Sequence, residues 1–91
     1  MDYQTALALA QRMRDNWNNW NDLQRGEAIV LFRNAGESHR KLAKIVGCSE
    51  GLIRHIEIVG RLPLGWKQLI LNGHSTRRVV AAWRALRKRG Q

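Results

Sequence analysis

The stretch HRKLAKIVGCSEGLIRHIEI, residues 39–58, contains the pattern that decides the fold. Ala43 is followed four positions later by Gly47, and Ile53 follows six positions after the glycine. Two short helices that cross closely need a small residue at the crossing, a glycine with positive φ in the tight turn and an apolar side chain between them. The spacing therefore predicts a helix-turn-helix over residues 39–59. An ordinary helical hairpin with the same packing is the alternative.

Apolar residues recur at helical spacing over the rest of the chain, and no segment alternates as a strand would. We therefore expect an all-α fold, a compact bundle of about six helices, over residues 3–17, 23–35, 39–46, 50–59 and 64–72 and from residue 76 onward. The expected N-caps are Asp2, Asp22, Ser38, Ser49, and Ser75 or Thr76. The expected stops are Gly36, Gly47, Gly60 with Pro63, and Gly73. In the last helix, Val79, Trp83 and Leu86 form the expected apolar stripe.

Length and composition indicate one helical domain over residues 1–91. The chain is 44% hydrophobic and 25% charged, which is ordinary for a globular protein, and no apolar run approaches the roughly 20 residues of a membrane span. The N-terminus lacks the basic segment of an export signal, and the single cysteine, Cys48, fits a reducing compartment. We expect a soluble, cytoplasmic protein associated with the nucleoid.

Charge is unevenly distributed along this basic protein. Sixteen Lys and Arg residues against seven Asp and Glu give a net charge of +9, and the last acidic residue is Glu57. Twelve of the cations are Arg, whose planar guanidinium binds phosphate through two hydrogen bonds. The charge therefore predicts a polyanionic partner, most simply nucleic acid. A basic, solvated surface without a partner is the alternative.

In a helix-turn-helix, residues 50–59 would be the recognition helix, with the N-terminal turn facing bases in the major groove. Arg54 can donate two hydrogen bonds to guanine O6 and N7, and Glu50 can accept one from cytosine N4. Gly51 would let the backbone approach closely, and His55 can donate to a base edge or a phosphate. A carboxylate in the first turn also suits the helix dipole, so Glu50 has a structural alternative. The predicted base-reading residues are Ser49, Glu50, Gly51, Arg54 and His55.

Further cations flank the motif and begin the last helix. Arg77 and Arg78 fall in a first helical turn, where the helix dipole disfavours a cation unless an anion lies beside it. Cations at positions 87–89 suit a helix C-terminus for stability alone. The predicted contacts to the DNA backbone are Lys41, Lys44, Arg61, Arg77, Arg78 and Arg84.

From about Gly26 to Val80 the sequence resembles the helix-turn-helix domain of ParB- and KorB-type partition proteins of plasmids and chromosomes. The resemblance depends on a helix ending at Gly36, the L-A-x-x-V-G-x-S run of residues 42–49, Leu62-Pro63, and a short helix closed by Gly73 before a polar cap. It covers about 55 of the 91 residues. The chain has no room or motif for that family's nucleotide-binding and dimerisation domains, so the sliding-clamp activity is not implied. The resemblance implies a DNA-reading module alone, which reads a palindrome through Ser49, Gly51, Arg54 and His55 and holds the backbone through Arg77 and Arg78.

The sequence does not predict an enzyme. His39, His55, His74 and Cys48 lack the short paired spacing of zinc ligands, and no Ser-His-acid trio or Gly-rich phosphate loop is present. We expect no metal, no cofactor and no small-molecule ligand. Aromatic residues at helical spacing are more often core, so we expect Trp17, Trp66 and Trp83 inside and leave Trp20 open between core and partner surface.

These features predict sequence-specific binding of double-stranded DNA by a small transcriptional regulator of a bacterium, plasmid or phage. An accessory plasmid-partition or centromere-binding protein is one alternative, and an RNA-binding or protein-adaptor module is another. Stacking on single strands requires exposed aromatic residues. Because most of the tryptophans are expected inside, duplex DNA is favoured over single-stranded RNA. One such motif covers few base pairs, so a homodimer is expected. The N-terminal helix either caps the core or forms the dimer contact through Tyr3, Leu7, Ala10 and Trp17, with Trp20 nearby.

Overall fold

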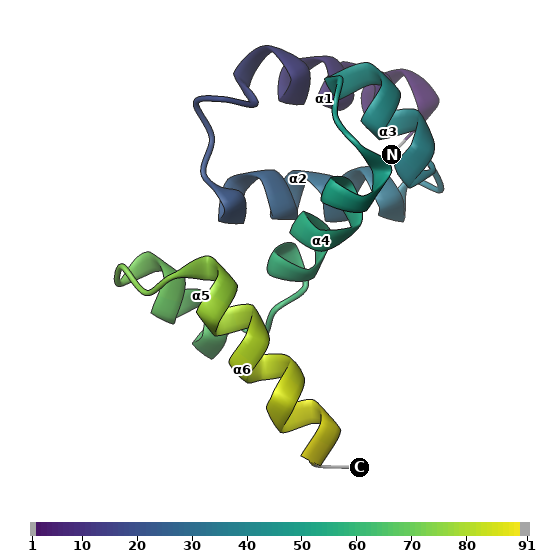
Figure 1. Ribbon diagram of the computed structural model, residues 1–91. Helices are drawn as coiled ribbons and strands as arrows, with labels where there is room; N and C mark the ends of the chain where they lie inside the picture. The colour runs from purple at the N-terminus through teal and green to yellow at the C-terminus, as the bar shows by residue number, and fades with distance from the viewer. Residues whose placement is uncertain (1, 90–91) are drawn as a thin grey trace. The chain divides into compact units, whose positions relative to one another are not determined.

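The computed structural model describes residues 2–89, and over that range it contains six helices and no strand (Figure 1). The expected all-α fold is confirmed. The chain divides into two compact units, the first ending at Arg61 and the second beginning at Leu62. The helices are α1 (Tyr3–Asn16), α2 (Asp22–Asn34), α3 (His39–Val46), α4 (Glu50–Gly60), α5 (Leu64–Leu71) and α6 (Thr76–Arg89).

Within residues 2–89 a short polar residue precedes every helix except α5, which follows Pro63, and four of these five residues are the expected caps. Asp2, Ser38 and Ser49 each accept a hydrogen bond from the amide three residues later, and Ser75 rather than Thr76 precedes α6. The expectation of Asp22 as the cap of α2 is wrong. Asn21 Oδ1 accepts from the Gln24 amide at 2.8 Å, and Gln24 Oε1 accepts from the Asn21 amide at 3.0 Å. This reciprocal capping box requires an acceptor side chain three residues after the cap, and the residue at that distance from Asp22 is an arginine.

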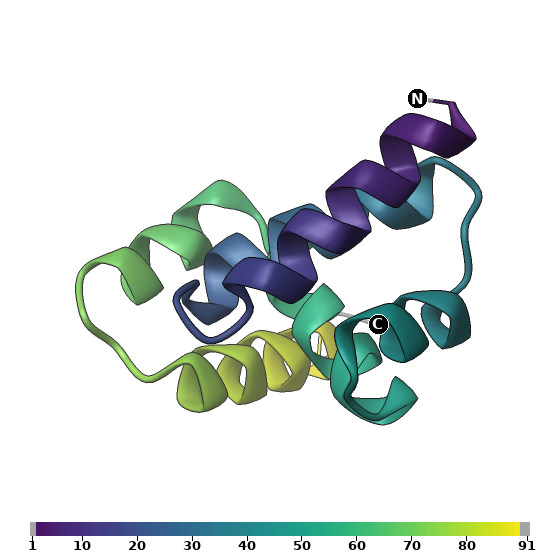
Figure 2. The ribbon, with the colours of Figure 1, turned by 90° about the horizontal axis from the view of Figure 1, so that it is seen from above.

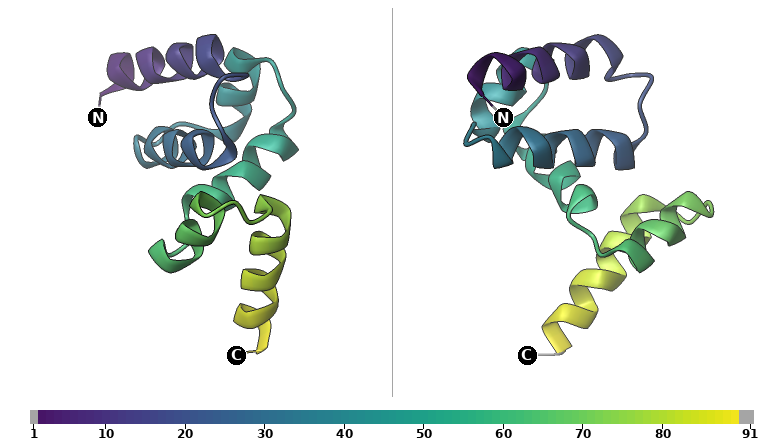
Figure 3. Two further views of the ribbon diagram at one scale, coloured as in Figure 1. Left: turned by 90° about the vertical axis from the view of Figure 1, so that its left-hand side faces the viewer. Right: turned by 180° about the vertical axis from the view of Figure 1, so that it is seen from behind.

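The first unit has a core to which all four of its helices contribute. In Figure 1, α1 and α2 form two layers, with α3 beside α1 and α4 crossing α2, and the views from other sides agree (Figures 2 and 3). In the α3–α4 pair Leu42, Ala43, Ile53 and Ile56 are buried, and Val46 is partly buried. The core consists of Ala6, Ala10, Met13, Ala28, Ile29, Phe32, Leu42, Ala43, Ile53 and Ile56.

Two glycines let the backbones of α2 and α4 touch. Gly60 was expected to stop the fourth helix, but it is the last residue of α4 and is buried. A Cβ atom added to Gly60 would lie 2.1 Å from the carbonyl oxygen of Gly26, and one added to Gly26 would lie 2.5 Å from the Gly60 amide nitrogen. Neither position tolerates a side chain at this separation. The pair therefore sets how closely α4 approaches α2.

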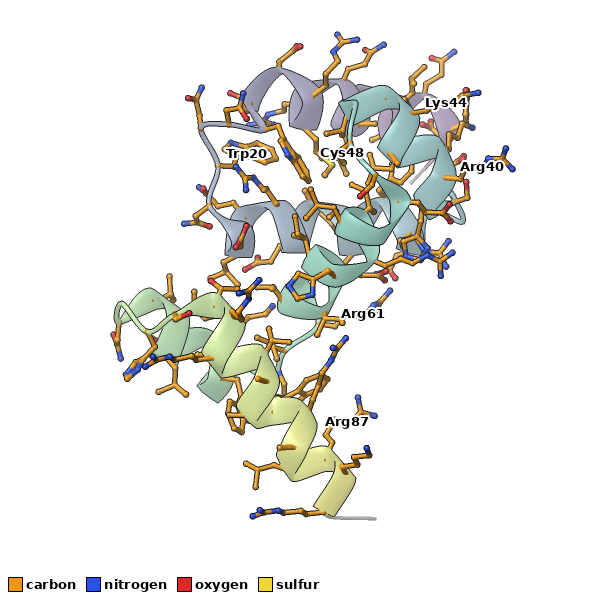
Figure 4. The ribbon with its side chains drawn as sticks, in the orientation of Figure 1. Trp20, Arg40, Lys44, Cys48, Arg61 and Arg87 are labelled. Atoms are coloured by element: carbon orange, nitrogen blue, oxygen red, sulfur yellow. The ribbon has the colours of Figure 1, made fainter. Side chains whose placement is uncertain are left out.

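The tryptophans are less enclosed than expected. Trp17 and Trp20 are partly buried and pack against the core of the first unit, and Figure 4 shows Trp20 between α1 and α2. Trp20 therefore contributes to the core. Trp66 and Trp83 are only partly buried, because a unit of two helices has too little interior to enclose an indole ring.

In the second unit α5 contacts α6, and the buried residues are Leu62, Val79 and Val80. The expected apolar stripe of α6 is buried only at its beginning, since Leu86 is 54% exposed. Helix α5 has no buried residue. None of the helices within residues 2–89 is long and apolar enough to span a membrane.

Candidate nucleic-acid interface

A tight turn sets the direction in which α4 leaves α3. Gly47 has φ 88°, as expected, and the amides of Gly47 and Cys48 both donate to the carbonyl oxygen of Ala43, at 2.8 and 3.1 Å. Ser49 then caps α4 by accepting from the Leu52 amide at 3.1 Å. The start of α4 is therefore fixed both by the turn and by its cap.

Helix α4 has one face buried in the core and one face exposed to solvent. Ile53 and Ile56 are buried in the core, whereas Gly51, Arg54 and His55 are exposed. Of the other two predicted base-reading residues, Ser49 is exposed and Glu50 is partly buried. All five thus lie at the part of α4 and its cap that is open to a partner. A further residue, Leu52, is 40% exposed in the same turn. Its helical position, about 100° from Ile53, was the available signal for this exposure.

Two of the predicted base-reading residues bond to each other. Arg54 Nη2 donates to Glu50 Oε1 at 2.8 Å, and the two side chains remain 62% and 41% exposed. The hydrogen bond from Arg54 is the main reason that the pKa of Glu50 lies below its ordinary value, with smaller contributions from the charges of Arg40 and His39. Their spacing of four residues on a helix could have predicted this pair.

A second glutamate forms hydrogen bonds with the first residue of α3 and with the residue that follows α4. Glu57 accepts hydrogen bonds from His39 Nε2 and, at 2.7 Å, from Arg61 Nε, and its side chain is only 12% exposed. Burial raises the pKa of Glu57, but the two hydrogen bonds outweigh it and hold the pKa below its ordinary value. Arg61, a predicted phosphate contact, is therefore already bound to a carboxylate.

Helix α3 carries one paired and two unpaired cations. Lys41 Nζ donates to Glu37 Oε2 at 2.9 Å and lies 4.2 Å from the ring centroid of Tyr3. The hydrogen bond to Glu37 raises the pKa of Lys41. Arg40 and Lys44 point away from the helices in Figure 4, and neither forms an ion pair with any part of the chain that the structure describes.

The second unit is basic throughout. It has no acidic residue, and the predicted phosphate contacts Arg77, Arg78 and Arg84 are all exposed. Residues 77, 84 and 88 are cations at spacings of seven and four, so they share one side of α6, while Arg87 stacks on Trp83 at 4.8 Å. This side of α6 offers an uncompensated positive charge.

The described residues contain no group of three His, Cys, Asp or Glu side chains placed to hold a metal ion. Burial raises the pKa of the Cys48 thiol, so at neutral pH it remains a thiol rather than a nucleophilic thiolate. Comparison of the chain with family models, curated proteins and solved structures finds no match. The side chains of α3, α4 and α6 are therefore the observations that bear on function.

Proposed function

We propose that this protein binds double-stranded DNA in a sequence-specific way, with α3 and α4 as a helix-turn-helix and α4 as its recognition helix. The observation that supports this most is the division of α4. It buries Ile53 and Ile56 in the core while it exposes Gly51, Arg54 and His55. A helix of 11 residues is about 16 Å long and fits a major groove that is ~12 Å wide.

Affinity for the DNA backbone is proposed to come from the unpaired cations. Lys44 on α3 and Arg77, Arg78 and Arg84 on α6 are exposed and lack a carboxylate partner within residues 2–89. Lys41 and Arg61 would contribute less, because each already bonds a glutamate. Contacts to phosphate position the protein on the duplex, and contacts to base edges provide the sequence preference.

In this proposal the protein is a small transcriptional regulator in the cytoplasm of a bacterium, or one carried by a plasmid or phage, and not an enzyme. The resemblance to ParB- and KorB-type domains makes an accessory role in plasmid partition the related alternative, with the same DNA contacts. Two copies bound to the halves of a palindrome would supply the specificity that one short helix lacks.

The test begins with selection of bound sequences from random duplex DNA. On the selected site, Arg54→Ala should cost about 1 to 3 kcal/mol and relax the preference at one base pair, because it removes a contact to a base. Arg77→Ala should weaken binding to all duplexes about equally, because it removes a contact to phosphate. Circular dichroism checks that both variants remain helical.

Two results would contradict the proposal. If folded Arg54→Ala and Arg77→Ala proteins lose the same affinity on selected and random duplexes, α4 is not the recognition helix. If single-stranded RNA displaces the selected duplex at equal or lower concentration, duplex DNA is not the preferred partner.

A further inference from the structure

Three glutamates of the first unit each bond a cation one helical turn later. The pairs are Glu37 with Lys41 at 2.9 Å, Glu50 with Arg54 at 2.8 Å and Glu57 with Arg61 at 2.7 Å. In every pair the cation is one of the predicted DNA contacts. The cations proposed to face DNA are therefore of two kinds, those that bond a glutamate and those without a carboxylate partner within residues 2–89.

The Glu50–Arg54 pair differs from the other two in exposure. The carboxylates of Glu37 and Glu57 are 18% and 12% exposed, so they are enclosed by the first unit and serve its packing. Glu50 is 41% exposed and lies in the first turn of α4, at the proposed base-reading surface. Of the three carboxylates, only that of Glu50 can exchange its arginine for a group on DNA without being withdrawn from the protein interior.

We infer that Glu50 is a specificity-determining residue that holds Arg54 in the free protein and releases it to a G·C base pair. This inference depends on the proposed function. Guanine offers Arg54 two acceptors, O6 and N7, and the paired cytosine offers Glu50 the N4 donor, so one base pair replaces the bonds of both side chains. Because the bonded atoms of Glu50 and Arg54 are 2.8 Å apart and stacked base pairs are about 3.4 Å apart, both contact the same pair or adjacent pairs.

Other base pairs leave this exchange incomplete. Thymine presents only the O4 acceptor, and adenine places the N6 donor beside N7, where it opposes the second N–H of Arg54. On such sites Arg54 stays with Glu50, and the neutralised pair adds little attraction to the polyanion. A glutamate that loses Arg54 without gaining a donor is repelled by the phosphates. Glu50 therefore acts mainly by weakening binding to the wrong sequences.

The experiment compares two variants that remove the same charge from pairs of the same spacing. The dissociation constants of the full chain, Glu50→Gln and the matched control Glu37→Gln are measured on the selected duplex and on the same duplex with the critical G·C pair changed to A·T. We expect Glu50→Gln to reduce the ratio of the two constants about five- to tenfold, chiefly through tighter binding to the A·T duplex. Glu37→Gln should change both constants by the same factor.

A second background isolates the pair itself. With Arg54→Ala already present, Glu50→Gln should change the ratio much less, because no guanidinium remains to be held and only the bond from cytosine N4 is altered. Glu50→Asp keeps the charge but shortens the side chain, so it should reduce the ratio while leaving the salt dependence of binding as in the unaltered chain.

The outcomes separate this inference from the function on which it depends. A selected duplex that binds no more tightly than a scrambled one overturns the proposed function itself. A clear preference that Glu50→Gln leaves within twofold of its original value overturns only the role of Glu50. An equal effect of Glu50→Gln with and without Arg54 also overturns it, because the effect of the carboxylate would then not depend on the arginine.

Discussion

Replacing Gly60 by alanine tests the close crossing of α2 and α4. The new methyl group would lie 2.1 Å from the carbonyl oxygen and 2.2 Å from the carbonyl carbon of Gly26, and 2.8 Å from the amide nitrogen of Glu27. All three atoms belong to the backbone of α2, so no side chain can rotate away to make room. The helices must separate, or α4 must end earlier.

The size of the effect follows from two opposing contributions. Alanine is about 1 kcal/mol more favourable than glycine in a helix interior, and this value is an upper limit for Gly60, the last residue of α4. Overpacking of a fixed core typically costs about 1 to 3 kcal/mol, and contact with backbone places this site at the upper end. The net loss is therefore about 2 kcal/mol, which lowers the melting temperature of a domain of this size by about 8 to 16 °C.

Urea denaturation followed by helical circular dichroism measures this loss, with Gly51→Ala as the control. Gly51 is in the same helix, and a Cβ atom added there meets nothing within 4 Å. Gly51→Ala should therefore gain up to about 1 kcal/mol, leaving the two alanine variants about 3 kcal/mol apart. If Gly60→Ala and Gly51→Ala have the same stability within about 0.5 kcal/mol, the backbones of α2 and α4 do not touch as described.

Three further measurements address binding, acid stability and assembly. Duplex affinity should fall steeply with salt, with a log–log slope of about −0.9 per neutralised phosphate, and a flat response would remove the electrostatic argument for nucleic acid. Because the pKa of Glu57 is lower in the folded protein, this carboxylate stabilises the fold fully above the ordinary pKa of 4.5, and the stabilisation is lost as the pH falls further. Glu57→Gln should therefore lower the free energy of unfolding by about 1 to 3 kcal/mol at pH 7 and by progressively less in acid. A cost that does not change with pH would refute this. Sedimentation equilibrium should find two copies on a palindromic duplex, and one copy on an asymmetric site would exclude the dimer.

The elements that could be predicted from the sequence are those with short-range causes. A cap, a positive-φ glycine and an apolar repeat each act within a few residues, so the turn at Gly47 and the burial of Ala43 and Ile53 follow from their immediate neighbours. The error at the start of α2 has the same origin. Asn21 and Asp22 are both good caps, and only the position of Gln24 distinguishes them.

Contacts between distant parts of the chain could not be predicted in this way. Nothing near Gly60 indicates that Gly26 lies against it, so the local sequence predicts a helix stop there rather than a point of close approach. The sequence leaves the position of Trp20 open for a related reason, since only the packing of α1 on α2 places it against the core. In the candidate site, helical spacing alone permits both a bond between Glu50 and Arg54 and separate contacts to bases. Which of these two arrangements forms depends on whether DNA is bound.

The role of α1 illustrates how packing restricts an assembly hypothesis. Ala6, Ala10 and Met13 are fully buried in the first unit, so the face of α1 that includes Ala10 caps the core and is not available to a second copy. Trp17 is partly buried on the same core. A homodimer through α1 must therefore use other parts of its surface, such as the open groove that α1 forms with Leu31 of α2. The groove contains one cation, Arg12, and residues 1–34 have no net charge, so two copies would meet there without the repulsion that opposes contact between two second units.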